Sequence, residues 1–281
     1  MGTIDVHVHL PTRRDVCDAR DLPFLEGAGV RLGESPPVHE LLREMDAGAI
    51  DVAVVQAPPP AAGTRHSNDE LAAAIRPHRD RLIGFGMVDP RSDPDVSSSV
   101  RRCVEQLGFR GIGEFGYVAM ADPVFFPLYE ACIALDVPIL VHTGTTLPST
   151  PIALGHPSLL DEVVIRYPEL KVIAAHCGVP WFMELACVAV RHPNIWIDVS
   201  ALPLFPEAMR YQILITMLVA HLGGRLLFGS DFPVVRPSLW ATWARSRKLS
   251  FPLSRLIGLP AFSKAQHHAL MEGNARCLLG L

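Results

Sequence analysis

The sequence of 281 residues has little charge and no surplus of positive charge. Charged residues make up 19% of the chain, and 25 Lys and Arg stand against 29 Asp and Glu, which gives a formal net charge of −4. Without a basic surplus there is no electrostatic reason to bind a polyanion such as nucleic acid. We therefore expect a small-molecule substrate and no nucleic-acid partner.

Paired cysteines and long apolar runs are also missing. The six cysteines are scattered without a CxxC pair, and several lie in apolar stretches, where a free thiol behaves as a small hydrophobic side chain. The first residues lack the basic and apolar regions of a secretory signal, and the apolar run Ile213–Ala220 is too short to span a bilayer. The sequence thus predicts a soluble cytoplasmic protein without a membrane partner, and it leaves a homo-oligomer open.

No linker or low-complexity tract divides the chain, and short apolar runs recur along it instead. Each run is followed by a loop and by a segment with helical periodicity. Continuously apolar runs are typical of parallel strands that are covered on both faces. The runs are Thr3–His9, Ile50–Gln56, Leu82–Val88, Gly111–Phe115, Pro138–His142, Lys171–His176, Asn194–Val199 and Arg225–Ser230.

The segments between the runs predict helices, and the whole pattern predicts the fold. Pro94 and Pro123 each follow an aspartate and are expected at the first helical position, where a missing N–H costs nothing. An open doubly wound sheet is the weaker alternative, because no Gly-rich phosphate loop follows the first run. Eight βα units of about 35 residues predict an α/β fold, a (β/α)8 barrel of the TIM type, as one domain over residues 1–281. The expected helices are Asn68–His78, Pro94–Leu107, Pro123–Leu135, Ser158–Tyr167, Trp181–Arg191, Glu207–Leu222 and Ser263–Leu279.

Histidines and carboxylates stand at the ends of the expected strands, where the active sites of barrels are built. The i, i+2 spacing of the first two histidines places both imidazoles on one face of the first strand. Four imidazoles and two carboxylates suit a divalent metal, zinc first, with manganese or iron as alternatives. Such a metal lowers the pKa of a bound water toward about 7, and Asp231 is expected to act as the general base. The candidates are His7, His9, Glu114, His142, His176 and Asp231.

Other roles remain open for some of these residues and their neighbours. Asp231 could cap a following helix, and Glu114 could support a ligating histidine or lie exposed in a loop. Asp198 is expected to be structural. Cys177 directly follows His176 and is expected to point away from the site.

Substrate recognition is expected from the enlarged loops, above all from Leu10–Pro37, which could fold over the site as a lid. An arginine of this loop could clamp a substrate carboxylate, or it could pair with an acidic neighbour on a solvated surface. The loop contains Arg13, Arg14, Arg20 and Arg31, with Asp15, Asp18, Asp21 and Glu26 as possible partners. Further contributors are expected in Arg65 and His66, in residues 143–156, and in Trp240 and Trp243.

Motifs along the chain carry a family resemblance. They are IDVHVHL at 4–10, NDELAAAIRPHRDRLIGFGMVDP at 68–90, VHTG at 141–144, PELKVIAAHCG at 168–178, FGSDFP at 228–233 and EGNARCLLGL at 272–281. With them the chain resembles the amidohydrolase superfamily, in the branch that includes aminocarboxymuconate-semialdehyde decarboxylase. The resemblance implies that His7, His9, His142 and Asp231 hold one metal. It further implies that His176 orients or deprotonates the bound water, or serves as another ligand.

The segment GIGEFG at 111–116 is similar to a motif of metal-dependent deoxyribonucleases of the same superfamily, in which a Glu bridges two metals. That similarity implies a site with one or two ions, the second held by His142 and His176. No lysine ends the fourth strand, so the chain offers no candidate for a carboxylated-lysine bridge.

The resemblance to hydrolytic branches favours one reaction. We expect a metal-dependent hydrolase in which metal-activated water attacks a small amide, lactone or ester-like substrate. The alternative is a non-oxidative decarboxylase of a small unsaturated or aromatic carboxylic acid, which would use much the same ligands. A barrel that binds metal or ligand without turnover is disfavoured because both Asp231 and His176 are present.

Overall fold

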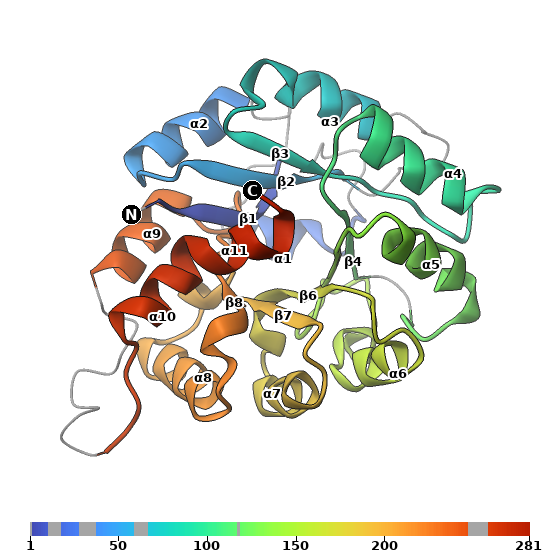
Figure 1. The fold of residues 1–281 in the computed structure, drawn as a ribbon. Helices are drawn as coiled ribbons and strands as arrows, with labels where there is room; N and C mark the ends of the chain where they lie inside the picture. Colours follow the sequence, from blue (N-terminus) through green and yellow to red (C-terminus); the bar gives the residue numbers. More distant parts are fainter. Residues whose placement is uncertain (1, 11–17, 28–37, 59–66, 117–118, 247–257) are drawn as a thin grey trace.

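The strands form a ring that is surrounded by helices (Figure 1). The computed structural model describes residues 2–10, 18–27, 38–58, 67–116, 119–246 and 258–281. The strands are β1 (Ile4–His9), β2 (Val52–Gln56), β3 (Leu82–Phe85), β4 (Ile112–Phe115), β5 (Ile139–Val141), β6 (Val172–Ala174), β7 (Ile195–Asp198) and β8 (Leu226–Leu227). Each lies within one of the apolar runs, so the predicted order of strands is confirmed.

All paired neighbours run parallel, in the orders β1-β2-β3 and β4-β5-β6-β7-β8. Isolated parallel bridges join the two groups, from Gly86 to Ile112 and from Val8 to Phe232. The N–H of Val6 also donates to the carbonyl of Phe228 at 2.9 Å, which ties β1 to the chain after β8. The ring therefore closes, and the predicted (β/α)8 barrel is confirmed.

The helices mostly connect successive strands and lie outside the ring, but the last one lies across the ring (Figure 1). They are α1 (Leu22–Gly27), α2 (Val38–Ala47), α3 (Ser67–Ile75), α4 (Val96–Arg101), α5 (Phe126–Ala134), α6 (Ser158–Arg166), α7 (Phe182–Arg191), α8 (Glu207–Val219), α9 (Pro237–Arg245), α10 (Lys264–His268) and α11 (Asn274–Leu279). Within the described ranges, no helix is long and apolar enough to cross a membrane.

Two helix starts test the proline prediction. Pro123 begins a 3-10 turn that leads into α5, and the Asp122 side chain caps it by accepting from the N–H of Val124 at 2.9 Å. The expectation for Pro94 is wrong, because α4 begins at Val96. There the side chain of Asp95 caps the helix by accepting from the N–H of Ser98 at 3.1 Å. The capping acceptor is therefore Asp95 rather than Asp93, which moves the start of the helix beyond Pro94.

Alternation along the strands sorts their side chains into two apolar layers. In β5, Leu140 belongs to a cluster inside the barrel, whereas Ile139 and Val141 belong to the larger cluster between barrel and helices. The inner cluster also includes Leu278 and Leu279 of α11. Because period 2 directs every second side chain inward, a polar residue that continues an inward row beyond its strand reaches the barrel mouth.

Strand β1 contains an irregularity that sets the direction of its histidines. Asp5 pairs with Ala53 and Val8 with Val55, so β1 has one residue more than β2 over this stretch. Such a bulge shifts the alternation. The Asp5 carboxylate stabilises it by accepting from the N–H of His7 at 3.2 Å and from that of Ser230 at 2.9 Å. Burial raises the pKa of Asp5 to about 7.

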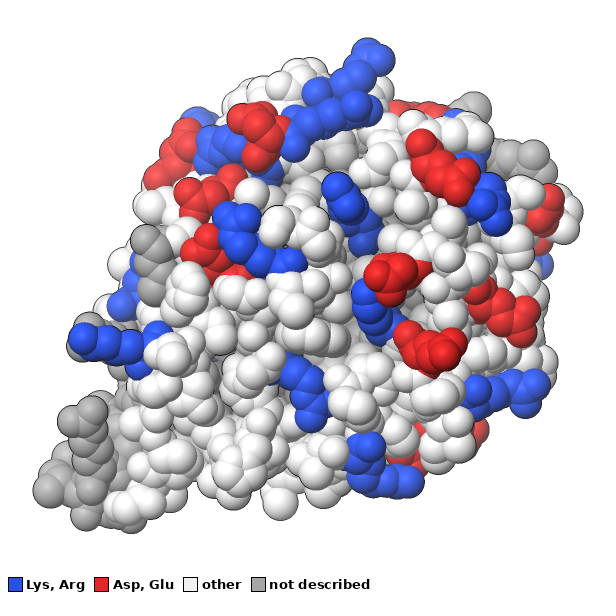
Figure 2. All heavy atoms as spheres, in the orientation of Figure 1, with Lys and Arg blue, Asp and Glu red and all other residues white. Residues whose placement is uncertain are grey.

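The surface carries both signs of charge. On the face shown in Figure 2, basic and acidic side chains are interspersed, and wide areas between them are uncharged. No field of one sign dominates this face, in agreement with the small net charge of −4.

Candidate metal centre

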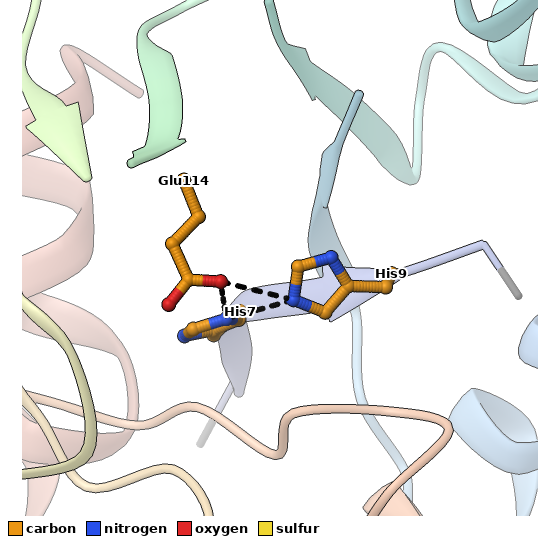
Figure 3. Close-up of side chains that lie close together, drawn as sticks. All are labelled: His7, His9 and Glu114. Carbon is orange, nitrogen blue, oxygen red and sulfur yellow. Dashed lines mark hydrogen bonds and ion pairs between the residues drawn. The ribbon is translucent and has the colours of Figure 1, made fainter. Parts of the chain in front are cut away.

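The histidines of β1 meet the carboxylate of Glu114 from β4 (Figure 3), and the carboxylate of Asp231, which follows β8, lies near the same imidazoles. The Nε2 atoms of His7 and His9 lie 3.0 Å apart. Glu114 Oε2 lies 3.4 Å from each of them, and Asp231 Oδ1 lies 3.8 Å from that of His7 and 3.5 Å from that of His9. The structure thus brings four of the predicted residues together around one point.

These separations fit a bound divalent cation. Ligand bonds of about 2.1 Å put neighbouring donor atoms about 3.0 Å apart at right angles and about 3.4 Å apart at tetrahedral angles. The distances of 3.0 and 3.4 Å among the donor atoms of His7, His9 and Glu114 match this range. Those from Asp231 Oδ1 to the two imidazoles, 3.5 and 3.8 Å, are slightly longer. Two imidazole nitrogens and two carboxylate oxygens are also the donor chemistry that zinc and manganese accept.

The second oxygen of Glu114 faces the two remaining histidines. Oε1 lies 3.0 Å from Nδ1 of His142 and 3.4 Å from Nε2 of His176. The Glu114 side chain is 14% exposed, so the alternative of an exposed loop carboxylate is wrong. Its two oxygens face two different pairs of imidazoles, which is the arrangement expected of a group shared between two cation positions.

The close approach of β4 and β5 positions Glu114. Gly113 has a φ of 129°, and a Cβ on this residue would lie 2.3 Å from the carbonyl oxygen of Leu140. Only glycine permits both this conformation and this contact. His142 directly follows β5, and its N–H donates to the carbonyl of Phe115 at 2.7 Å. The two strand ends that present Glu114 and His142 are therefore joined directly.

His176 does not continue its strand. The predicted strand Lys171–His176 ends at Ala174, and His176 and Cys177 have φ values of 59° and 53°. This left-handed backbone costs roughly 1–2 kcal/mol per residue, and the N–H of His176 donates to Asp198 Oδ1 at 3.0 Å within it. Cys177 is buried and donates to the carbonyl of Asp198 at 3.3 Å, and burial raises its pKa well above the ordinary value. The thiol is therefore poorly suited to act as a nucleophile.

Asp198 and Ser200 are site residues that the sequence reasoning missed. Asp198 Oδ2 lies 2.9 Å from Nδ1 of His7, and Ser200 Oγ lies 2.8 Å from Nδ1 of His176. Asp198 was expected to be structural, yet it contacts two residues of the centre. The available signal was the alternation of Trp196, Asp198 and Ser200, which continues the inward row of β7.

Opposite charges in this buried cluster shift the pKa values of its members. Burial alone would lower the pKa of His7, but the charges of Glu114 and Asp198 outweigh it and raise that pKa well above its ordinary value. Burial would raise the pKa of Glu114, but the charge of His7 and the hydrogen bond with His142 hold it well below the ordinary value. The imidazoles thus keep Glu114 ionised, as a cation ligand must be.

The other expectations for the site have mixed outcomes. Helix α9 begins at Pro237 with Arg236 at its N-cap, so Asp231 caps no helix there.

In the loop after β1, Arg20 pairs with Asp18 on the surface, as the solvated alternative predicted. Asp21 is buried and accepts from the N–H and the hydroxyl of Ser149, both at 2.7 Å. The expected substrate-facing residues Arg13, Arg14, Arg31, Arg65 and His66 lie outside the described residues.

The two tryptophans after β8 belong to the packing of the barrel. Trp240 is 1% exposed and lies in the outer cluster, with its ring 6.3 Å from that of Phe228 and 4.8 Å from that of Trp243. The expectation that Trp240 contributes to substrate recognition is therefore wrong. Its indole is occupied by core packing.

Comparison with known proteins identifies the family. The family model described as Amidohydrolase matches residues 4–281, so the chain belongs to this family. A gamma-resorcylate decarboxylase of Polaromonas sp. strain JS666 is 25% identical to the chain, with 92% of this chain and 96% of that protein covered. A 2-amino-3-carboxymuconate-6-semialdehyde decarboxylase of Dictyostelium discoideum is 24% identical, with 77% of this chain and 66% of that protein covered.

A solved structure shares the fold. It is a dihydroxybenzoic acid decarboxylase of Polaromonas sp. JS666 with bound manganese and the inhibitor 2-nitroresorcinol. It superposes with a TM-score of 0.70 at 21% identity, over 100% of this chain and 97% of that one.

These relatives correct one expectation. The prediction of a hydrolase is wrong, because a gamma-resorcylate decarboxylase and a 2-amino-3-carboxymuconate-6-semialdehyde decarboxylase match along most of this chain. Glu114 and the GIGEFG segment had favoured hydrolysis, but the same ligands serve both reactions and cannot decide between them.

Proposed function

We propose that this protein is a metal-dependent, non-oxidative decarboxylase of a small unsaturated or aromatic carboxylic acid. The observation that carries the proposal is the convergence of His7, His9, Glu114 and Asp231 on one cation position. The barrel that bears this centre aligns over 92% of its length with a decarboxylase, which supports the choice of reaction.

The reaction has simple requirements. The bond between the substrate carbon and its carboxylate breaks, the electron pair stays on that carbon, and the carbon takes up a proton as CO2 leaves. When bound, a divalent cation supplies positive charge that orients the anionic substrate and withdraws electron density from it. The chain must therefore hold the cation and deliver one proton.

His176 and Asp231 are the proposed proton carriers. His176 Nε2 faces Glu114 Oε1 at 3.4 Å, and Asp231 Oδ1 faces His9 Nε2 at 3.5 Å. Their side chains are 11% and 15% exposed, so both can exchange a proton with solvent while facing the centre. A group in this position can first take up a proton from solvent and then donate it to a carbon that lies above the cation ligands.

The cation is proposed to be zinc, with manganese as the second candidate because the similar structure contains it. His7, His9 and Glu114 form one position, with Asp231 beside it, and Glu114 Oε1, His142 and His176 offer a second, so the bound metal should amount to one or two equivalents. We further propose a cytoplasmic location, since the cysteines Cys103, Cys132, Cys177, Cys187 and Cys277 are all free.

A substrate panel tests the reaction. The purified protein, loaded with zinc or with manganese, is incubated with 2,6-dihydroxybenzoate, 5-carboxyvanillate and related unsaturated acids. We expect release of CO2 in D2O together with a product that carries deuterium at the former carboxylate carbon. Asp231→Asn should keep most of its metal and lose turnover by about 100-fold or more. Hydrolysis products without CO2 would contradict the proposal.

A further inference from the structure

We propose that Ser200, oriented by Asp198, is a positioning residue that fixes the proton of His176 on Nδ1 and so presents an unprotonated Nε2 to the centre. The inference deepens the proposed function, because it explains how His176 becomes competent to bind a cation or to accept a proton. Its geometric basis is the set of contacts that Asp198, at the end of β7, and Ser200 make with His176, which follows β6.

The two residues lie side by side beneath the imidazoles. Asp198 and Ser200 are both fully buried. Ser200 Oγ contacts Asp198 Oδ1 and lies 2.8 Å from His176 Nδ1. Asp198 Oδ1 also accepts from the N–H of Ser200 at 2.9 Å, so the serine is attached to the carboxylate through both its backbone and its hydroxyl.

Counting protons leaves one arrangement. An ionised carboxylate only accepts, so the single hydroxyl proton of Ser200 must point to Asp198. Ser200 Oγ then has only lone pairs to offer to His176. The short contact between Oγ and Nδ1 is a hydrogen bond only if Nδ1 carries the proton. A neutral His176 therefore has a bare Nε2, which faces Glu114.

His7 does not compete for the serine. Its Nδ1 lies 3.3 Å from Ser200 Oγ but only 2.9 Å from Asp198 Oδ2, and the carboxylate oxygen is the stronger acceptor. Asp198 thus fixes the proton of His7 directly and that of His176 through Ser200. One buried carboxylate sets the tautomers of imidazoles from two different strands.

Removing the hydroxyl should reverse the tautomer of His176. In Ser200→Ala, Nδ1 loses its acceptor, whereas Nε2 keeps Glu114 Oε1 at 3.4 Å as a partner. The proton then moves to Nε2, where it blocks the atom that faces the centre. Ser200→Thr retains the hydroxyl and should retain the tautomer.

Nitrogen-15 NMR of the full chain, labelled in histidine, measures this directly. In metal-free protein at pH 8, with the His176 signals identified by their loss in His176→Gln, we expect a protonated Nδ1 and a bare Nε2. Ser200→Ala should show the proton on Nε2, and Ser200→Thr should restore the wild-type pattern. A Ser200→Ala protein that keeps the proton on Nδ1, or a wild type with the proton on Nε2, would overturn the proposal.

A matched control and a kinetic measurement complete the test. Ser230 is also fully buried, but its hydroxyl contacts the backbone of His7 and Phe232 and the side chain of Asp5 rather than Asp198 or His176, so Ser230→Ala should leave the His176 tautomer unchanged. In the metal-loaded enzyme, Ser200→Ala should lower kcat by about 10-fold with little change in KM, and Ser200→Thr should recover it. If no acid is decarboxylated, the proposed function fails while the NMR result still decides the role of Ser200.

Discussion

The two sides of the centre are built differently. On one side, His7 and His9 come from a single strand, and the fully buried His7 is held by the carboxylate of Asp198. On the other side, His142 and His176 follow two different strands, and His176 depends on a left-handed turn and on Ser200. The β1 side is thus fixed by regular structure, whereas the β5–β6 side depends on support from β7.

Glu114 belongs to both sides, and its replacement should have the largest effect. Glu114→Gln keeps the shape of the side chain but removes the charge that faces four imidazoles. We expect turnover to fall by at least about 100-fold, together with the metal content measured after dialysis against stoichiometric zinc. Full metal content with unchanged turnover would show that the sides do not share this group.

Comparing His7→Ala with His142→Ala tests the unequal support of the two sides. Loss of His7 leaves the buried Asp198 without its imidazole, so the free energy of unfolding should fall by about 2 to 4 kcal/mol in chelated protein. The His142 side chain is 20% exposed, and its loss should cost about 1 kcal/mol or less. Urea unfolding of both variants in the same buffer measures the two free energies of unfolding. Equal decreases would show that the two sides of the centre are supported equally.

A smaller effect should arise from Asp5, which supports only the β1 side. Its pKa is about 7 in the folded chain and 3.8 as the ordinary value, so between these pH values the folded state binds a proton that the unfolded state has lost. The free energy of unfolding should therefore fall as pH rises through this window, by up to about 1.4 kcal/mol per pH unit.

Asp5→Asn should lack this dependence. Urea unfolding of the metal-free wild type and variant at pH 5, 6 and 7 gives the two slopes, and titrations common to both proteins cancel in their difference. Equal slopes for the wild type and the variant would mean that Asp5 is ionised in the folded chain over this range.

Regular structure explains what the sequence could predict. The eight apolar runs contain the eight strands because continuous burial leaves a continuous apolar signal. His7 and His9 were recognisable for the same reason, as their spacing matches a strand. The bulge at Asp5 was not foreseen, because an extra residue in a strand leaves no mark in hydrophobicity alone.

The features that could not be predicted from the sequence lie in irregular structure. The conformation of His176 depends on a hydrogen bond to Asp198, which lies 22 residues further along the chain. Such a contact is invisible to local patterns, and Ser200 therefore went unnoticed. The reaction was misjudged for a chemical reason, since cation ligands for hydrolysis and for decarboxylation are the same side chains.

Closure of the barrel between β1 and β8 also has a consequence for assembly. Ser230 reaches back across 225 sequence positions to Asp5, and Asp231 donates its N–H to the carbonyl of His7 at 2.8 Å. The donors that face one cation are thus contributed by the first strand and by the segment after the last. An unfolded chain would have to close a very long loop to bring them together. The chain should therefore bind a cation only after the ring has closed. A bound cation would then stabilise the contact between β1 and the segment after β8.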